Sequence, residues 1–326
     1  MRAPEFWSRR DPGLARLLRP LASAWTLAGR LRRRLVQPVR VSVPVICIGN
    51  LVAGGAGKTP AVIALAEACA ERGLAPHVLT RGYGGRLEGP TRVDPARHRP
   101  DDVGDEALLL ARVAPSWVAG DRIKGAKAAI AAGARIILMD DGFQNPSLGK
   151  DRSYLVIDGG FGFGNGRVMP AGPLREPVED GLARADGIIL IGADTTDVVA
   201  TLPPSIPIHR ARFTPVAGAE AIAGRAFVAF AGIGRPEKFF ATLKSLGANL
   251  RAARAFPDHH PYTPDEIMRL VEEARAADAE LITTEKDAVR LAPEARAMVR
   301  VLAVALTWDD PANPDALIAP ALERKG

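Results

Sequence analysis

The chain has 326 residues, of which 47% are apolar and 25% are charged. This length can bury a substantial core and, at usual domain sizes, divides into two domains. Two cysteines, Cys47 and Cys69, supply neither a disulfide framework nor metal-ligand spacing. This excludes a small disulfide-stabilised secreted domain and favours a reduced, cytoplasmic compartment.

The positive charge is concentrated at the N-terminus. The formal net charge is +6, but residues 1–40 contain ten arginines against Glu5 and Asp11, so the rest of the chain carries a small negative charge. The isoelectric point near 9.6 by itself suggests a nucleic-acid-binding protein. Because the charge lies in one leucine-rich segment without a recognised reading motif, we rank this class last and expect no nucleic-acid partner.

Residues 14–36 place leucines and Trp25 at helical spacing, with arginines around them. An apolar stripe bordered by arginine is typical of a helix that lies on an anionic bilayer surface, whereas the charges are too frequent for a segment that spans the membrane. A helix packed on the protein with its arginines in solvent is the alternative, and an arginine-rich leader can also imitate an organellar transit peptide. Pro20 is expected to kink this helix or to begin its second half.

Residues 45–60 indicate a buried strand, a glycine-rich turn and the first turn of a helix. Glycines let several backbone N–H groups point at one spot beside a helix N-terminus, which makes a phosphate cradle. The strict phosphate-loop pattern has glycine where this chain has Val52, so the match is to GGxGKT. We expect Lys58 to reach the outer phosphates of a nucleotide and Thr59 to hold Mg²⁺. The predicted nucleotide-binding residues are Gly54, Gly55, Ala56, Gly57, Lys58, Thr59 and, from a later loop, Arg175.

The remaining chain alternates short apolar runs with helical stretches, which predicts an α/β fold with a parallel sheet flanked by helices. Strands are predicted at 77–80, 116–119, 134–139, 154–158, 187–192, 227–230, 281–284 and 299–305, and helices at 60–72, 107–113, 122–132, 236–246 and 264–276. The prolines in residues 203–207 indicate a boundary. The predicted division is an N-terminal amphipathic helix (1–40), a phosphate-loop domain (41–212) and a smaller α/β domain (213–326).

Acidic residues follow two of the predicted strands. A strand that ends in aspartate, as at Asp140 and Asp141, is where phosphate-loop proteins hold a metal-binding carboxylate. Asp158 repeats this arrangement. In the long loop that follows, Arg175 can neutralise phosphate charge, and Glu176 can approach the metal or orient Arg175. The predicted metal-holding residues are Thr59, Asp140, Asp141 and Glu176.

Two further polar positions are ambiguous on spacing alone. Asp105 precedes a helical run, where an acidic residue is ordinarily a cap. His259 and His260 precede another predicted helix, where a histidine pair is usually a cap or part of a surface loop. The pattern alone therefore assigns no catalytic role to either position.

Seven motifs, taken together and in this order, resemble those of the tetraacyldisaccharide 4′-kinases, the lipid A 4′-kinases of Gram-negative bacteria. They are Gly49–Leu51 with Gly54–Pro60, Arg81–Gly84, Val103–Glu106, Asp140–Gln144, Pro170–Glu176, Phe256–His260 and Thr284–Ala288. They extend over nearly the whole chain. The departures are small: Ala107 stands where proline is frequent, and Asn145 where histidine often follows the glutamine.

The resemblance implies phosphorylation of the 4′-hydroxyl of a membrane-embedded tetraacyl glucosamine disaccharide 1-phosphate, with ATP and Mg²⁺ as cofactors. It places the protein peripherally at the cytoplasmic face of the bacterial inner membrane. It also implies that Asp105 accepts the hydroxyl proton and that His259, brought in by domain closure, hydrogen-bonds Asp105. Lys58 and Arg175 then offset charge on the moving phosphoryl group.

Two other classes remain as alternatives. A membrane-associated positioning or partition ATPase shares the GGxGKT pattern, but such proteins carry a lysine before the paired glycines, where this chain has Ala53. A kinase for a soluble metabolite needs neither Trp25 nor the arginines around it.

Overall fold

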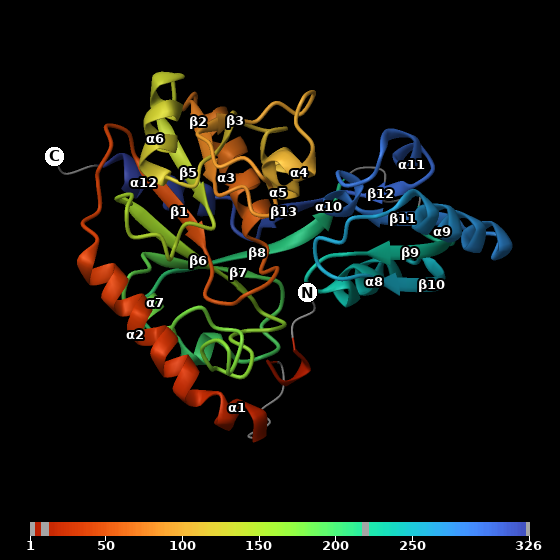
Figure 1. Ribbon diagram of the computed structural model, residues 1–326, viewed down its shortest axis with the longest axis horizontal. Helices are drawn as coiled ribbons and strands as arrows, with labels where there is room; N and C mark the ends of the chain where they lie inside the picture. Colours follow the sequence, from red (N-terminus) through yellow and green to blue (C-terminus); the bar gives the residue numbers. More distant parts are fainter. Residues whose placement is uncertain (1–3, 8–12, 217–221, 324–326) are drawn as a thin grey trace.

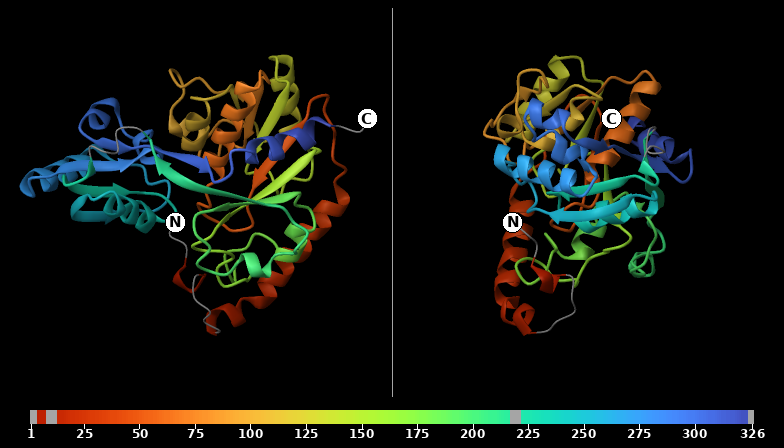
Figure 2. Two further views of the ribbon diagram at one scale, coloured as in Figure 1. Left: turned by 180° about the vertical axis from the view of Figure 1, so that it is seen from behind. Right: turned by 90° about the vertical axis from the view of Figure 1, so that its right-hand side faces the viewer.

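The computed structural model describes residues 4–7, 13–216 and 222–323. In these ranges the chain forms two β-sheets that lie side by side, each covered by helices, and a long N-terminal helix that runs along the outside of the larger sheet (Figures 1 and 2). We call the larger sheet with its helices the larger unit, and the sheet within residues 226–302 with its helices the smaller unit.

The larger sheet has nine strands in the described ranges. From edge to edge they are β13 (Val304–Trp308), β8 (Ile208–Pro215), β7 (Gly187–Ile191), β6 (Arg152–Asp158), β1 (Val45–Gly49), β5 (Ile136–Asp140), β2 (Pro76–Thr80), β4 (Ser116–Val118) and β3 (Thr91–Arg92). Only the edge strands β13 and β3 are antiparallel to their neighbours in this sheet of described residues. Every residue of β1 and β5 is buried, as expected where helices cover both faces of a parallel sheet. The predicted α/β class is confirmed.

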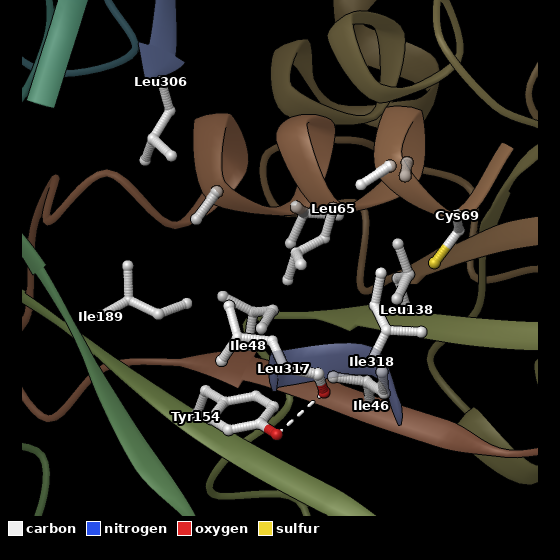
Figure 3. Packing of buried hydrophobic residues seen from close by; sticks show 14 of the residues in the cluster. Ile46, Ile48, Leu65, Cys69, Leu138, Tyr154, Ile189, Leu306, Leu317 and Ile318 are labelled. Atoms are coloured by element: carbon white, nitrogen blue, oxygen red, sulfur yellow. Dashed lines mark hydrogen bonds between the residues drawn. The ribbon is translucent and has the colours of Figure 1, made fainter. Parts of the chain in front are cut away.

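Helices pack on both faces of this sheet. On one face lie α3 (Lys58–Glu71), α5 (Asp105–Leu110) and α12 (Asn313–Leu322), and on the other lies α6 (Arg122–Ala131). In Figure 3, Leu65 of α3 and Leu317 of α12 meet Ile48 of β1. Burying each such side chain contributes about 1.5–3 kcal/mol. Short elements complete the unit: α4 (Pro100–Val103), α7 (Val178–Leu182) and the 3₁₀ turns Glu5–Trp7 and Val199–Thr201.

The smaller unit is a parallel sheet between two longer helices. Its strands, in order, are β10 (Asn249–Ala255), β9 (Ala226–Ala231), β11 (Glu280–Thr284) and β12 (Arg300–Leu302). Helix α8 (Pro236–Ser245) packs on one face and α9 (Pro264–Ala276) on the other, with α10 (Glu285–Ala288) and α11 (Pro293–Ala297) following β11. Thr263 and Glu266 form a capping box that begins α9.

The sheets divide the chain differently from the predicted boundary between residues 212 and 213. That boundary falls inside β8, and the single strand predicted at 299–305 is two strands, β12 in the smaller sheet and β13 in the larger. Leu306 of β13 and Leu317 of α12 are buried in the core of the larger unit, so the chain returns there after Ala303. A short apolar run identifies a strand but not the sheet that it joins.

The N-terminal segment forms α1 (Gly13–Leu17) and α2 (Arg19–Leu35). Pro20 lies in the first turn of α2, where its missing N–H costs no helical hydrogen bond. The second of the two expectations for Pro20, that it begins a new helix, is therefore confirmed.

Candidate active site

The glycine-rich loop joins β1 to α3. Gly57, directly before α3, has a φ of 91°, and a Cβ at this position would lie 2.6 Å from Ile191 Cδ1, so only glycine fits. Gly54 has a φ of 117°, and a Cβ at Gly54 or Gly55 would meet no atom within 4 Å. The loop backbone therefore borders open space at the N-terminus of α3, the position where helices bind phosphate.

Lys58 lies over this loop. Its Nζ is 3.2 Å from Asn50 Oδ1 and 3.7 Å from Asp141 Oδ1. Asn50 is fully buried and donates from Nδ2 to the Val52 carbonyl oxygen at 2.7 Å. Asn50 thus holds the lysine against the loop. It stands in one of the recognised motifs, but the sequence pattern gave no reason to assign it this role.

Asp140, the last residue of β5, contacts Thr59. The Thr59 hydroxyl lies 3.4 Å from Asp140 Oδ2, and Asp140 Oδ1 is buried without a hydrogen-bond partner. Burial, with help from Glu106 and Asp141, raises the pKa of Asp140 to about 7. A buried carboxylate with a free oxygen beside a phosphate loop is suited to a cation, so the pair fits the predicted metal site.

Asp141 and Arg175 form a bidentate ion pair. Arg175 Nη1 donates to Asp141 Oδ1 at 2.6 Å, and Nη2 donates to Oδ2 at 3.1 Å. Burial favours the neutral acid, but Lys58 and Arg175 outweigh it and lower the pKa of Asp141. The structure therefore brings Arg175 to the site beside Lys58, as the phosphate-binding prediction requires, with Asp141 as its present partner.

Glu176 contacts side chains other than Asp140 and Thr59 in this structure, and its membership of the metal-holding set stays a prediction. Its Oε1 accepts from Gln144 Nε2 at 3.2 Å, and its Oε2 contacts Arg33 of α2 at 3.0 Å and also Arg184. The Arg175 and Glu176 side chains both contact the Gln144 amide group, Arg175 at 3.4 Å and Glu176 at 3.2 Å. Glu176 therefore links α2 to the larger unit.

Asp105 meets His259 across the interface between the two units. Asp105 begins α5 and is 3% exposed, and His259 Nδ1 lies 3.0 Å from its Oδ2. This oxygen is buried and also lies 3.5 Å from Arg290 Nε. The ring of Tyr83 lies edge-on to that of His259, with centroids 5.4 Å apart. The contact implied by the family resemblance is present.

Cations of the smaller unit surround this pair. Lys286 Nζ lies 3.2 Å from His259 Nε2 and donates to Glu106 Oε1 at 3.1 Å, and Arg290 Nε lies 3.5 Å from Asp105 Oδ2. Burial opposes ionisation, but His259, Lys286 and Arg290 outweigh it and lower the pKa of Asp105. Sequence reasoning missed Glu106, Lys286 and Arg290 as part of the site, although the first two stand in recognised motifs.

His260 has a different environment from its neighbour. Its Nε2 lies 3.1 Å from both carboxylate oxygens of Glu266, the residue that closes the capping box of α9. The histidine pair thus divides into one structural residue and one residue at the site.

The phosphate loop and a buried, ionised aspartate from α5 face the same interface, and the second unit closes over both. A carboxylate placed to receive a hydroxyl proton beside a nucleotide cradle defines a phosphate-loop phosphotransferase, an enzyme that transfers a phosphoryl group to an alcohol.

Comparison with known proteins shows which family of phosphotransferases the chain resembles. Residues 14–323 match the family model described as tetraacyldisaccharide-1-P 4′-kinase. A curated tetraacyldisaccharide 4′-kinase from Rhodospirillum centenum is 54% identical to this chain, and the match covers 100% of this chain and 98% of that protein. A second one, from Gluconacetobacter diazotrophicus, is 55% identical, and the match covers 99% of each protein. The crystal structure of the "apo" form of LpxK from Aquifex aeolicus in complex with ATP superposes with a TM-score of 0.75 at 25% identity, covering 95% of this chain and 99% of that one.

The chain belongs to the tetraacyldisaccharide 4′-kinase family, and it is an ATP-binding kinase. Family membership over nearly the whole chain decides against the positioning ATPase and against a kinase for a soluble metabolite.

Proposed function

We propose that this chain transfers the γ-phosphoryl group of ATP to the 4′-hydroxyl of the tetraacyldisaccharide 1-phosphate precursor of lipid A, with Asp105 as the general base. The observation that carries the assignment of the base is the contact between buried Asp105 Oδ2 and His259 Nδ1, at 3.0 Å across the interface of the two units. His259 orients the carboxylate, and the cations around it keep it ionised at neutral pH. Lys58 and Arg175 offset charge on the phosphoryl group.

Mg²⁺ is the metal that this donor set fits. No group of three or more His, Cys, Asp or Glu side chains among the described residues is arranged to hold a metal. Mg²⁺ usually takes only one or two carboxylates and completes its shell with phosphates and water. Thr59 and Asp140 would hold it, and bound Mg²⁺ would neutralise charge on the β- and γ-phosphates.

The test of this function is product analysis. The purified chain should add one phosphate to the disaccharide 1-phosphate lipid in the presence of ATP and Mg²⁺, at the 4′ position, as read by mass spectrometry of fragments. A detergent-free soluble disaccharide without acyl chains serves as the control acceptor. ATP hydrolysis without transfer to the lipid would contradict the proposal.

We also propose that α2 holds the protein on the surface of the inner membrane, at its cytoplasmic face. The helix turns its polar side to the protein: Arg33 contacts Glu176 and Asp180 at 3.0 Å each, and Trp25 Nε1 donates to the Arg175 carbonyl oxygen at 3.0 Å. Its leucines face outward, with Leu27 68% and Leu35 73% exposed.

This orientation differs from the predicted packing alternative, in which the arginines lie in solvent, because α2 packs on the protein through Arg30 and Arg33 and exposes its leucines. Exposed apolar stripes of this size mark interaction surfaces, and unpaired arginines beside them favour anionic lipid. Arg16, Arg32 and Arg34 form no ion pair within the described residues. No helix in the described ranges has the length and apolar character needed to cross a bilayer.

Vesicle co-sedimentation tests the membrane proposal. Leu17→Ser with Leu21→Ser and Leu31→Ser should weaken binding to vesicles that contain phosphatidylglycerol, and deletion of residues 1–36 should weaken it further. Met268→Ser, which changes an apolar residue that is 41% exposed on α9, is the matched control. Undiminished binding of the triple variant would contradict the proposal.

A further inference from the structure

A second contact between the two units lies beside the phosphate loop and centres on Asp158. This residue ends β6 and is 5% exposed. Its Oδ1 accepts from the Gly160 N–H at 2.9 Å. Its Oδ2 accepts from Arg235, the residue directly before α8, and from Lys238 in the first turn of α8. The smaller unit thus places two cations on one carboxylate oxygen of the larger unit.

Arg235 also touches the phosphate loop itself. Its Nη2 donates to the Gly55 carbonyl oxygen at 3.0 Å, and its guanidinium carbon lies 5.1 Å from the centroid of the Phe161 ring. The preceding residue, Gly234, packs so closely that a Cβ there would lie 2.9 Å from the Gly55 nitrogen. The start of α8 therefore covers the rim of the phosphate cradle, and Arg235 is the side chain that reaches it.

The charges at this contact do not balance. Two cations share Asp158, and within the described residues neither Arg235 nor Lys238 contacts a second carboxylate. One positive charge is therefore left without a counter-ion at the entrance of a cradle built for phosphate. The Lys238 side chain is 45% exposed and reaches Asp158 from the surface.

We propose that Arg235 is a phosphate-positioning residue supplied by the smaller unit, which contacts the outer phosphates of ATP when the nucleotide fills the loop. The inference rests on the proposed function only in that it requires ATP in this loop. Lys238 remains on Asp158 and keeps the smaller unit in place. A planar guanidinium suits this role because it binds phosphate oxygens in pairs, and other phosphate-loop enzymes also use an arginine contributed in cis.

Isothermal titration calorimetry of the full chain with ATP, ADP and AMP, without lipid, tests the proposal directly. Arg235→Gln should weaken ATP binding by about tenfold, the usual effect of losing one charge-assisted contact, and should leave AMP binding unchanged. Arg235→Lys should recover part of the loss. Lys238→Gln should leave ATP affinity within about threefold of wild type, because its partner is Asp158. Lys244→Gln, at the other end of α8, is the matched control.

Wild-type ATP affinity in Arg235→Gln would overturn the proposal, and so would equal losses for ATP and AMP, which would indicate a structural role. Thermal unfolding of each variant shows whether it is folded. Because binding is measured without an acceptor, the result is independent of the proposed transfer. If the chain fails to phosphorylate the lipid while Arg235→Gln still weakens ATP binding, the proposed function fails and the inference stands.

Discussion

Two buried aspartates of the larger unit, Asp105 and Asp140, have opposite electrostatic environments. Asp105 is 3% exposed and Asp140 fully buried, so burial alone would raise both pKa values. The pKa of Asp105 is instead lowered, because His259, Lys286 and Arg290 of the smaller unit surround it. The pKa of Asp140 is raised to about 7, because its neighbours include Glu106 and Asp141.

These opposite pKa shifts suit the two aspartates to different roles. Asp105 is ionised as long as the smaller unit is closed over it, so it is ready to accept a hydrogen bond from an alcohol. Asp140 forms no ion pair with a described residue, and Lys58 only partly offsets the effect of burial on its pKa, so a bound cation would favour its ionised form. The smaller unit therefore controls the base, whereas the cradle and its metal control the nucleotide.

The largest expected effect is that of removing the base. Asp105→Ala should lower kcat by about 10²–10⁴-fold, the usual contribution of a positioned general base, because the proposed role of Asp105 is toward the acceptor and not the nucleotide. Steady-state kinetics and ATP titration measure the two quantities separately, and ATP affinity should stay near wild type. Equal losses in kcat and ATP affinity would instead give Asp105 a metal or nucleotide role.

Replacing His259 should have a smaller effect that depends on pH. His259→Gln removes the largest interaction that lowers the pKa of Asp105, so that pKa should rise. Since Asp105 must be ionised, activity falls as pH drops through its pKa, and the acid limb of the kcat/KM profile should move to higher pH. At neutral pH we expect about a tenfold loss, the equivalent of 1.4 kcal/mol, because the carboxylate loses the group that orients it. An unshifted acid limb would contradict the coupling between the two residues.

The metal site should respond to pH near 7. Folding raises the pKa of Asp140 to about 7, so without metal the free energy of unfolding should fall as pH rises from about 4 to about 7. Mg²⁺ competes with the proton, so its affinity should fall about tenfold per pH unit below 7. Calorimetry and thermal unfolding measure both trends, and Asp140→Asn should abolish them. Mg²⁺ affinity that is independent of pH in the wild type would contradict this account.

Glu176→Gln should change the chemistry least. It leaves Arg184 without its ion pair and Arg33 with Asp180 alone, and it should lower the free energy of unfolding by about 1–3 kcal/mol, the usual cost of an unsatisfied group. The Mg²⁺ concentration at half-maximal activity should not change. A large shift in that concentration would support the role as a metal ligand that the sequence predicted for Glu176.

The parts of the site that could be predicted from sequence are local in the chain. Residues 54–59 and Asp140 lie in short patterns whose geometry follows from a strand, a turn and a helix. The contact between Asp105 and His259 joins two units, and no spacing rule places it; only the resemblance to a known family did. The return of β13 to the larger sheet and the pairing of Asp158 with Lys238 likewise depend on tertiary packing. The contacts of Glu176 with Arg33 and Arg184 could not be predicted because its loop, unlike a strand, gives no periodicity that tells which side each residue faces.

A structure of the chain with a non-hydrolysable ATP analogue, Mg²⁺ and the disaccharide 1-phosphate lipid would test the central claim most directly. The claim predicts that Asp105 Oδ2 lies at a hydrogen-bond distance, about 2.6–3.2 Å, from the 4′-hydroxyl oxygen, with that oxygen facing the γ-phosphate. A 4′-hydroxyl bound to another carboxylate, with Asp105 turned away from it, would contradict the claim.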